Sequence, residues 1–254
     1  MEFIHFFITG NFDISQVASL DSIIRDNSIT YTIWASVLLL ILTAISAFIK
    51  KQNHIVKIIL FTSMITIISL NTLYLAGSTI YKNHRSITGG PVHWHADFEV
   101  WNCGKQLDLI DPEGWSNKIG TPVLHEHNDK RVHVEGVVLT DKYASLGNFF
   151  EVIGGKLSQY ELSFNSIEGQ VTANHGDLCN EKPGMVQVFV YKTEGDKYWQ
   201  EKVMNPEDYI LSGDSGVPPG DCIIVEFDSM IKERTEHMCQ SYRVQEQLGK
   251  ISEK

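Results

Sequence analysis

The sequence lacks the short motifs that mark several large enzyme classes. It has no G-x-S-x-G nucleophile elbow, no P-loop and no G-x-G-x-x-G dinucleotide fingerprint. It also has no C-x-x-C pair, which argues against a zinc ribbon or a thioredoxin-type redox centre. Nothing in the chain suggests Ser-His-Asp catalysis.

Positive charge is scarce as well. The formal net charge is −10 at pH 7, and the whole excess of acidic residues lies after residue 81. An acidic domain repels a phosphate backbone, so we expect no nucleic-acid partner.

Two stretches lack charge altogether. Residues 30–49 and 58–77 are each 20 residues long without a charged side chain, and about 20 apolar residues cross a bilayer as a helix. The alternative is a pair of buried core helices. We predict a transmembrane helical hairpin over residues 30–81, with the lipid bilayer as its partner. Asn71, the one strongly polar residue in these stretches, is expected to hydrogen-bond the neighbouring helix.

Basic residues near the hairpin predict its orientation. Lys50, Lys51 and Lys57 lie at the short connection, and aromatic residues occupy the opposite ends. By the positive-inside rule, the connection faces the cytoplasm and both termini face outward. The opposite side also carries three basic residues, so the difference in positive charge between the two sides is small. These residues are Arg25, Lys82 and Arg85. We therefore expect a two-pass cell-membrane protein whose globular domain lies outside the cytoplasm.

Changes in composition divide the rest of the chain. Residues 1–29 lack the basic start of a secretory signal, and are either an interfacial amphipathic helix or a frayed terminus. Residues 82–90 are a polar linker, 91–228 a domain of short alternating runs and turns, and 229–254 a charged helix or tail. The predicted fold class is mainly β, a sandwich or small barrel with short helices, preceded by the transmembrane hairpin.

Histidine is concentrated in one region of the domain. Five of the ten histidines lie between positions 93 and 133, in the patterns HWH, HEH and VHVE. A strand over VHWHADFEVW, residues 92–101, would place its two histidines, Asp97 and Glu99 on one face. A second strand would place His133 and Glu135 on one face in the same way. If the two strands share a sheet, their polar faces can meet.

This pattern predicts a transition-metal site. Two histidines at i, i+2 on a strand can share one ion at about 2.0–2.1 Å, and imidazole suits Zn, Cu, Fe and Mn, among which the sequence does not choose. The candidate ligands are His93, His95, His125, His127, His133 and Glu135. One ion cannot take all of these, so either two ions bind or some histidines orient others.

Further side chains are candidates for supporting roles. Four acids could orient histidine N–H groups: Asp97, Glu99, Glu126 and Asp129. Glu99 or Glu135 could act as a catalytic acid or base on a bound water. His175 is the most plausible additional ligand, whereas His84 and His237 are expected to be bystanders.

The segments HWHADFEVWNCGK, HEHNDKRVHVEG and SLGNFFEVIGG together resemble a group of uncharacterised prokaryotic membrane-anchored proteins. The resemblance covers residues 91–157 and more loosely 184–228. It implies an extracytoplasmic β domain with a histidine metal cluster, and no particular activity. His93, His95 and Glu99 also fit the cupin spacing H-x-H-x(3,4)-E, but the later cupin histidine is missing. The H-x-H pair is similar to that of copper–zinc superoxide dismutases, whose zinc loop is absent here; both are analogies of chemistry.

All four cysteines lie in the globular part of the chain: Cys103, Cys179, Cys222 and Cys239. An even number in an outward-facing domain predicts disulfides, and the sequence leaves all three pairings of two bridges open.

Three functions fit these observations. The first is a membrane-anchored module that binds a transition metal. The second is a cupin-like or hydrolase-like metalloenzyme, which needs an open coordination position and a pocket. The third is a structural or interaction protein whose histidines respond to pH.

Overall fold

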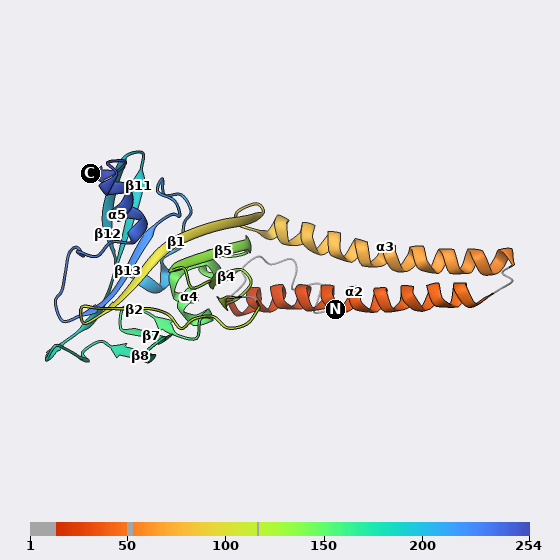
Figure 1. Ribbon diagram of the computed structural model, residues 1–254, viewed down its shortest axis with the longest axis horizontal. Coiled ribbons are helices and arrows are strands. Elements are labelled where there is room, and N and C mark those ends of the chain that lie inside the picture. The colour runs from red at the N-terminus through yellow and green to blue at the C-terminus, as the bar shows by residue number, and fades with distance from the viewer. Residues whose placement is uncertain (1–13, 50–52, 116) are drawn as a thin grey trace. The chain divides into compact units, whose positions relative to one another are not determined.

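The computed structural model describes residues 14–49, 53–115 and 117–254 (Figure 1). It divides into two compact units, residues 1–89 and 90–254. The predicted segment 1–29 falls partly outside the described residues. Its described part belongs to the first long helix.

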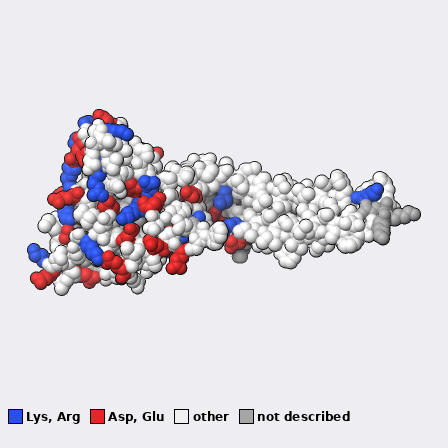
Figure 2. All heavy atoms as spheres, in the orientation of Figure 1, with Lys and Arg blue, Asp and Glu red and all other residues white. Residues whose placement is uncertain are grey.

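The first unit is a pair of long helices, α2 (Ile14–Phe48) and α3 (His54–Arg85). Asn53 caps α3 by accepting a hydrogen bond from the backbone N–H of Val56. Both helices are long and apolar enough to cross a membrane, over Leu20–Phe48 and His54–Arg85. The surface of this unit carries few charges, in contrast to the domain that follows (Figure 2). Two apolar helices followed by a mostly β domain confirm the predicted fold class.

Polar side chains within the helices find partners inside the helical pair. The hydroxyls of Thr43, Thr62 and Thr66 each donate to the carbonyl four residues earlier, which satisfies them in an apolar environment. Asn71 Nδ2 lies 3.5 Å from Thr32 Oγ1 on the other helix, as expected from its position. These hydroxyls and the amide nitrogen of Asn71 are thus turned toward the helix's own backbone or the neighbouring helix, whereas Asn71 Oδ1 has no hydrogen-bond partner among the described residues.

The second unit is built on a nine-stranded mixed sheet. The main path of the sheet, in spatial order, is β14 (Ser252–Glu253), β12 (Lys197–Val203), β11 (Met185–Glu194), β13 (Cys222–Asp228), β1 (Pro91–Asn102), β5 (Arg131–Val137), β4 (Leu124–Glu126) and β3 (Ile119–Gly120). β2 (Lys105–Leu107) pairs with the end of β1. β1 is thus central, with β5 antiparallel along its first half and β13 parallel along its second half (Figure 1).

Smaller elements complete the domain. A three-stranded sheet consists of β6 (Lys156–Leu157), β7 (Glu161–Ser166) and β8 (Gly169–Asn174), and β9 (Leu178–Cys179) pairs with β10 (Lys182–Pro183). The helical pieces are η1 (Asp141–Ala144), α4 (Leu146–Val152), η2 (Pro206–Asp208) and α5 (Gln240–Gln247). Ser145 caps α4 by accepting a hydrogen bond from the backbone N–H of Asn148.

The apolar face of β1 forms part of the hydrophobic core. Ala96, Phe98 and Val100 are buried, and they alternate with the polar residues of the same strand. Phe98 meets Phe149 of α4 edge to face, with ring centroids 5.4 Å apart. Burial of this face fixes the register of β1, because a slip by one residue would turn the histidines into the core.

Two disulfides close the domain. Cys103 is joined to Cys179, and Cys222 to Cys239, so the structure selects one of the three pairings that the sequence allows. The second bridge ties the segment before α5 to the start of β13. Tyr242 of α5 and Cys239 belong to a buried cluster with Phe189 and Ile224, which covers part of the sheet.

Candidate metal centre

Strand register brings the histidines together. In the β1–β5 ladder His95 is paired with His133, and His93 with Glu135. In the β5–β4 ladder His133 is paired with His125. Residues directly opposite on neighbouring strands have Cβ atoms about 4.5–5.5 Å apart. Three imidazoles therefore form a row across three strands.

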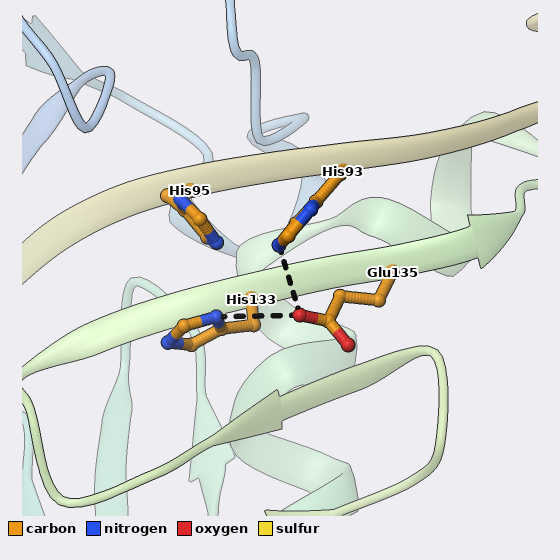
Figure 3. A group of neighbouring side chains, drawn as sticks. All are labelled: His93, His95, His133 and Glu135. Carbon is orange, nitrogen blue, oxygen red and sulfur yellow. Dashed lines mark ion pairs between the residues drawn. The ribbon is translucent and has the colours of Figure 1, made fainter.

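The side chains converge on a small space. Figure 3 shows His93 and His95 projecting from β1, and His133 and Glu135 from β5, toward one another. Glu135 Oε1 lies 3.0 Å from His93 Nε2 and 3.8 Å from His133 Nδ1. One potential ligand atom from each of these four residues lies within 4.8 Å of every other. The arrangement is geometrically able to hold a metal ion.

A second group shares two members with the first. His125 and His127 join His133 and Glu135, again with ligand atoms within 4.8 Å of one another. His125 Nε2 is 3.0 Å from His127 Nε2 and 3.7 Å from Glu135 Oε2. All six predicted ligands thus lie in two overlapping groups.

Asp129 determines the tautomer of His133. Its two carboxylate oxygens lie 3.1 and 3.2 Å from His133 Nε2. An ionised carboxylate only accepts hydrogen bonds, so Nε2 carries the proton and a neutral ring has its lone pair on Nδ1. Nδ1 is buried and has no hydrogen-bond partner among the described residues. A carboxylate–histidine pair with the second nitrogen free is the arrangement that orients metal-binding histidines.

A backbone carbonyl does the same for His127. Its Nδ1 lies 2.5 Å from the carbonyl oxygen of Asn117. A carbonyl oxygen cannot donate, so Nδ1 carries the proton and Nε2 of a neutral ring offers its lone pair to the cluster. Two of the five imidazoles are therefore held with an unprotonated nitrogen directed inward.

Burial keeps two further imidazoles neutral. His95 Nε2 and His125 Nδ1 are buried without hydrogen-bond partners in the described part of the chain. Burial, assisted by nearby His133 and His93, holds the pKa of His95 below its ordinary 6.5. Burial, together with Lys118 and His127, lowers the pKa of His125 to about 4. Neutral imidazole is the form that binds metals, so the site favours ligation at neutral pH.

Glycines let the neighbouring backbone approach the site. Gly120 on β3 has φ +113°, and a Cβ there would lie 2.5 Å from the carbonyl oxygen of Leu124, beside His125. Gly220 has φ +138°, and a Cβ there would overlap the carbonyl oxygen of His95. A side chain at either position would push β3 or the start of β13 away from a histidine-bearing strand.

The carboxylates further along β1 lie outside both groups. Asp97 accepts a hydrogen bond from Arg131 at 2.9 Å. Glu99 accepts from Trp101 Nε1 at 3.0 Å and from Arg243 at 3.3 Å. Burial raises the pKa of Glu99, against the hydrogen bond from Trp101 and the charge of Arg243. Both acids are committed to protein partners, so of the two predicted catalytic carboxylates only Glu135 is in the cluster.

The other candidates have separate environments. Glu126 accepts hydrogen bonds from the backbone N–H groups of Asp129 and Lys130, which shapes the turn after β4. His175 is exposed beside Tyr160, and His237 stacks on Trp101 with centroids 3.5 Å apart. Of the four acids proposed as orienting groups, Asp129 alone contacts a cluster histidine among the described residues. The Asn117 carbonyl has no signal in the sequence, because any residue supplies that atom.

A cavity of about 390 Å³ lies next to the cluster. Its walls include Asp97, Glu99 and Asp129 on one side and the α5 segment with Arg243 on the other. Asp129 thus lines the cavity and also contacts His133. A molecule in this cavity would touch the group that orients a candidate ligand.

Comparison with known protein families, with curated proteins and with solved structures finds no match for this chain. Function therefore has to be argued from the geometry of the cluster itself.

Proposed function

We propose that this is a membrane-anchored protein whose β domain binds a transition-metal ion through the histidine cluster and Glu135. The observation that carries the proposal is the buried, unpartnered Nδ1 of His133, whose other nitrogen is bonded to Asp129. Leaving a buried polar atom without a partner costs free energy. A metal ion supplies the missing partner and balances the negative charge that the Glu135 carboxylate brings beside several lone pairs.

The donor set suggests the class of metal. Imidazole nitrogens with one carboxylate suit Zn(II), Cu(II), Fe(II) or Mn(II), and oxygen-seeking Ca(II) and Mg(II) are poor matches. Histidine-rich sites of this kind also need neutral imidazoles, which the lowered pKa values of His95 and His125 provide at neutral pH.

Orientation is the second part of the proposal. The domain faces the outside of the cytoplasm, with α2 and α3 as its anchor. Two disulfides support this assignment, because disulfides persist in oxidising compartments. The lysines at the connection between the helices support it through the positive-inside rule. Thiol-labelling of a cysteine introduced at position 52 in intact cells and in permeabilised cells tests it; labelling only after permeabilisation is expected.

Metal analysis of the purified full-length protein in detergent tests the metal assignment. Stoichiometric Zn, Cu, Fe or Mn is expected after reconstitution and dialysis, and it should fall in the double variant His93→Ala/His95→Ala. His175→Ala is the matched control, because that histidine lies outside the cluster. Wild-type protein that retains no transition metal after reconstitution would refute the proposal.

The cavity favours a metalloenzyme as the second candidate function. His93 is 67% exposed, so solvent can reach the cluster, and the cavity is lined by Asp129, which contacts His133. An ion with an open position would activate a bound water there, with Glu135 available as a base. Cobalt-substituted protein reports coordination directly: a change in its visible spectrum on adding azide indicates an exchangeable position, and an unchanged spectrum indicates a closed structural site.

A further inference from the structure

The cluster offers more ligands than one ion takes. Zinc and similar ions bind about four protein or water ligands in protein sites. The two groups contain five imidazoles and one carboxylate between them. They share His133 and Glu135, and each has a histidine pair of its own.

The two histidine pairs that the groups do not share come from opposite sides of β5. His93 and His95 belong to β1, whereas His125 is on β4 and His127 directly follows it. β1 and β4 are the two neighbours of β5 in the sheet, so their backbones are separated by two strand spacings, about 10 Å. A single ion with bonds of about 2.0–2.1 Å would have to draw both pairs inward at once.

Glu135 stands between the pairs and turns one oxygen toward each. Oε1 is 3.0 Å from His93 Nε2, and Oε2 is 3.7 Å from His125 Nε2. A carboxylate placed this way can bridge two ions, and bridged ions in proteins lie about 3.5–4 Å apart.

We propose that the site holds two divalent transition-metal ions bridged by Glu135. This inference rests on the proposed metal-binding function. The first ion binds His93, His95 and Glu135 Oε1, and His133 Nδ1, 3.8 Å from Oε1, completes four protein ligands. The second ion binds the other histidine pair and Oε2. It has three protein ligands and therefore an open position for water or a small anion.

The two ions have different surroundings. The second ion lies against His125, whose side chain is fully buried, and against His127, which the Asn117 carbonyl orients. The first lies beside His93, the most exposed member of the cluster. We expect the exposed ion to be removed first by a chelator, so loss of metal should proceed in two steps.

Stoichiometry separates this inference from the simpler proposal. Full-length protein in detergent is stripped, reconstituted with Zn(II) and analysed for bound metal. Two ions per chain are expected in the wild type and in His175→Ala. One ion per chain is expected in His93→Gln/His95→Gln and in His125→Gln/His127→Gln. Circular dichroism confirms that each variant is folded, and the wild-type count stands even if a variant fails to fold.

Spin coupling tests the bridge. With Cu(II), the wild type should give the electron paramagnetic resonance spectrum of an exchange-coupled pair, and each double variant that of an isolated ion. One ion in the wild type, with none in either double variant, would overturn the two-ion site and leave the metal-binding proposal standing. Two uncoupled ions would overturn the bridge, and no bound ion would refute the metal-binding proposal itself.

Discussion

The two halves of β1 carry polar residues on the same face, but they differ in whether the buried polar atoms have hydrogen-bond partners. In the first half, His95 Nε2 is buried without a hydrogen-bond partner among the described residues. In the second half, Asp97 and Glu99 are also buried, but each is bonded to an arginine. Buried polar groups normally have partners. Within this strand, a missing hydrogen-bond partner distinguishes the half where we propose the metal site from the half that carries the carboxylates.

The same contrast separates stability from binding. Arg131 and Arg243 compensate the carboxylates of the second half, so that half is complete without any ligand. The first half carries the unpartnered Nε2 of His95, which lies opposite His133 of β5, and Asp129 orients the ring of His133. We expect substitutions in the second half to change the free energy of unfolding, and substitutions in the first half to change metal affinity.

Metal removal should have the largest effect. At a metal concentration one hundred times the dissociation constant, binding only to the folded state adds about 2.7 kcal/mol, which for a domain of this size is roughly 5–10 °C in Tm. Chelation should lower the Tm of the wild type by that amount, measured by near-ultraviolet circular dichroism. His93→Ala/His95→Ala should respond less, and His175→Ala like the wild type. If neither chelator nor added metal changes the Tm of the wild type, the proposed difference between the two halves of β1 is contradicted.

Asp129→Asn should weaken metal binding with little change in fold. The amide does not stabilise the inward lone pair of His133 as the carboxylate does, and losses of this kind are about 10–100-fold in affinity. Competition with a chromophoric chelator measures the dissociation constant. Asp196→Asn, at an exposed aspartate far along the chain on the β11–β12 turn, is the control and should leave it unchanged. Equal affinities in the two variants would remove Asp129 from its assigned role.

Arg243→Ala should destabilise the second half of the strand. It leaves the 6% exposed carboxylate of Glu99 with the Trp101 hydrogen bond alone. Because Arg243 itself is half-exposed, the expected cost is about 1 kcal/mol in the free energy of unfolding. Bound metal should not change. Arg234→Ala breaks an exposed pair with Glu253 and should cost less. A loss of metal in Arg243→Ala would show that the two halves are coupled.

The smallest effect concerns pH in the metal-free protein. The folded-state pKa of His125 is about 4 and its unfolded value 6.5, so the folded state resists protonation. Stability is fully present above pH 6.5 and is lost as pH falls toward 4, by less than about 1 kcal/mol between pH 7 and 6. Burial raises the pKa of Glu99, which acts in the opposite direction nearer pH 4.5. Urea titrations at several pH values measure the slope, and His125→Asn should flatten it between pH 7 and 5.

Sequence alone predicts much of this arrangement, for physical reasons. Alternation in VHWHADFEVW, residues 92–101, predicts β1 because half-buried strands repeat every two residues, and the observed strand extends one residue further at each end. β12, by contrast, has no such alternation in its sequence. Its sequence KYWQEKV has few β-branched residues, and it is stabilised by antiparallel pairing with β11 across the short turn at Gly195 and Asp196.

The composition of the cluster was predictable, and its internal roles were not. Spacing identifies His93 and His95 as neighbours on one face, but Glu99 has the same parity and lies outside the cluster. Cross-strand register decides between them: His95 is paired with His133, while Glu99 is paired with Ile224 of β13. Register depends on pairing between separate segments of the chain, such as β1 with β5 and β1 with β13, which no local pattern encodes.

The Cys222–Cys239 bridge fastens one wall of the cavity independently of the imidazoles. The segment from Cys239 to Gln245 forms that wall, and no cluster residue lies on it. A reducing agent would therefore release the α5 segment that covers Glu99. The pairing of β1, β5 and β4 would continue to hold the imidazoles in place. Access to the cavity would then depend on thiol redox conditions. Retention of the proposed metal ion would depend on pH and on competing chelators.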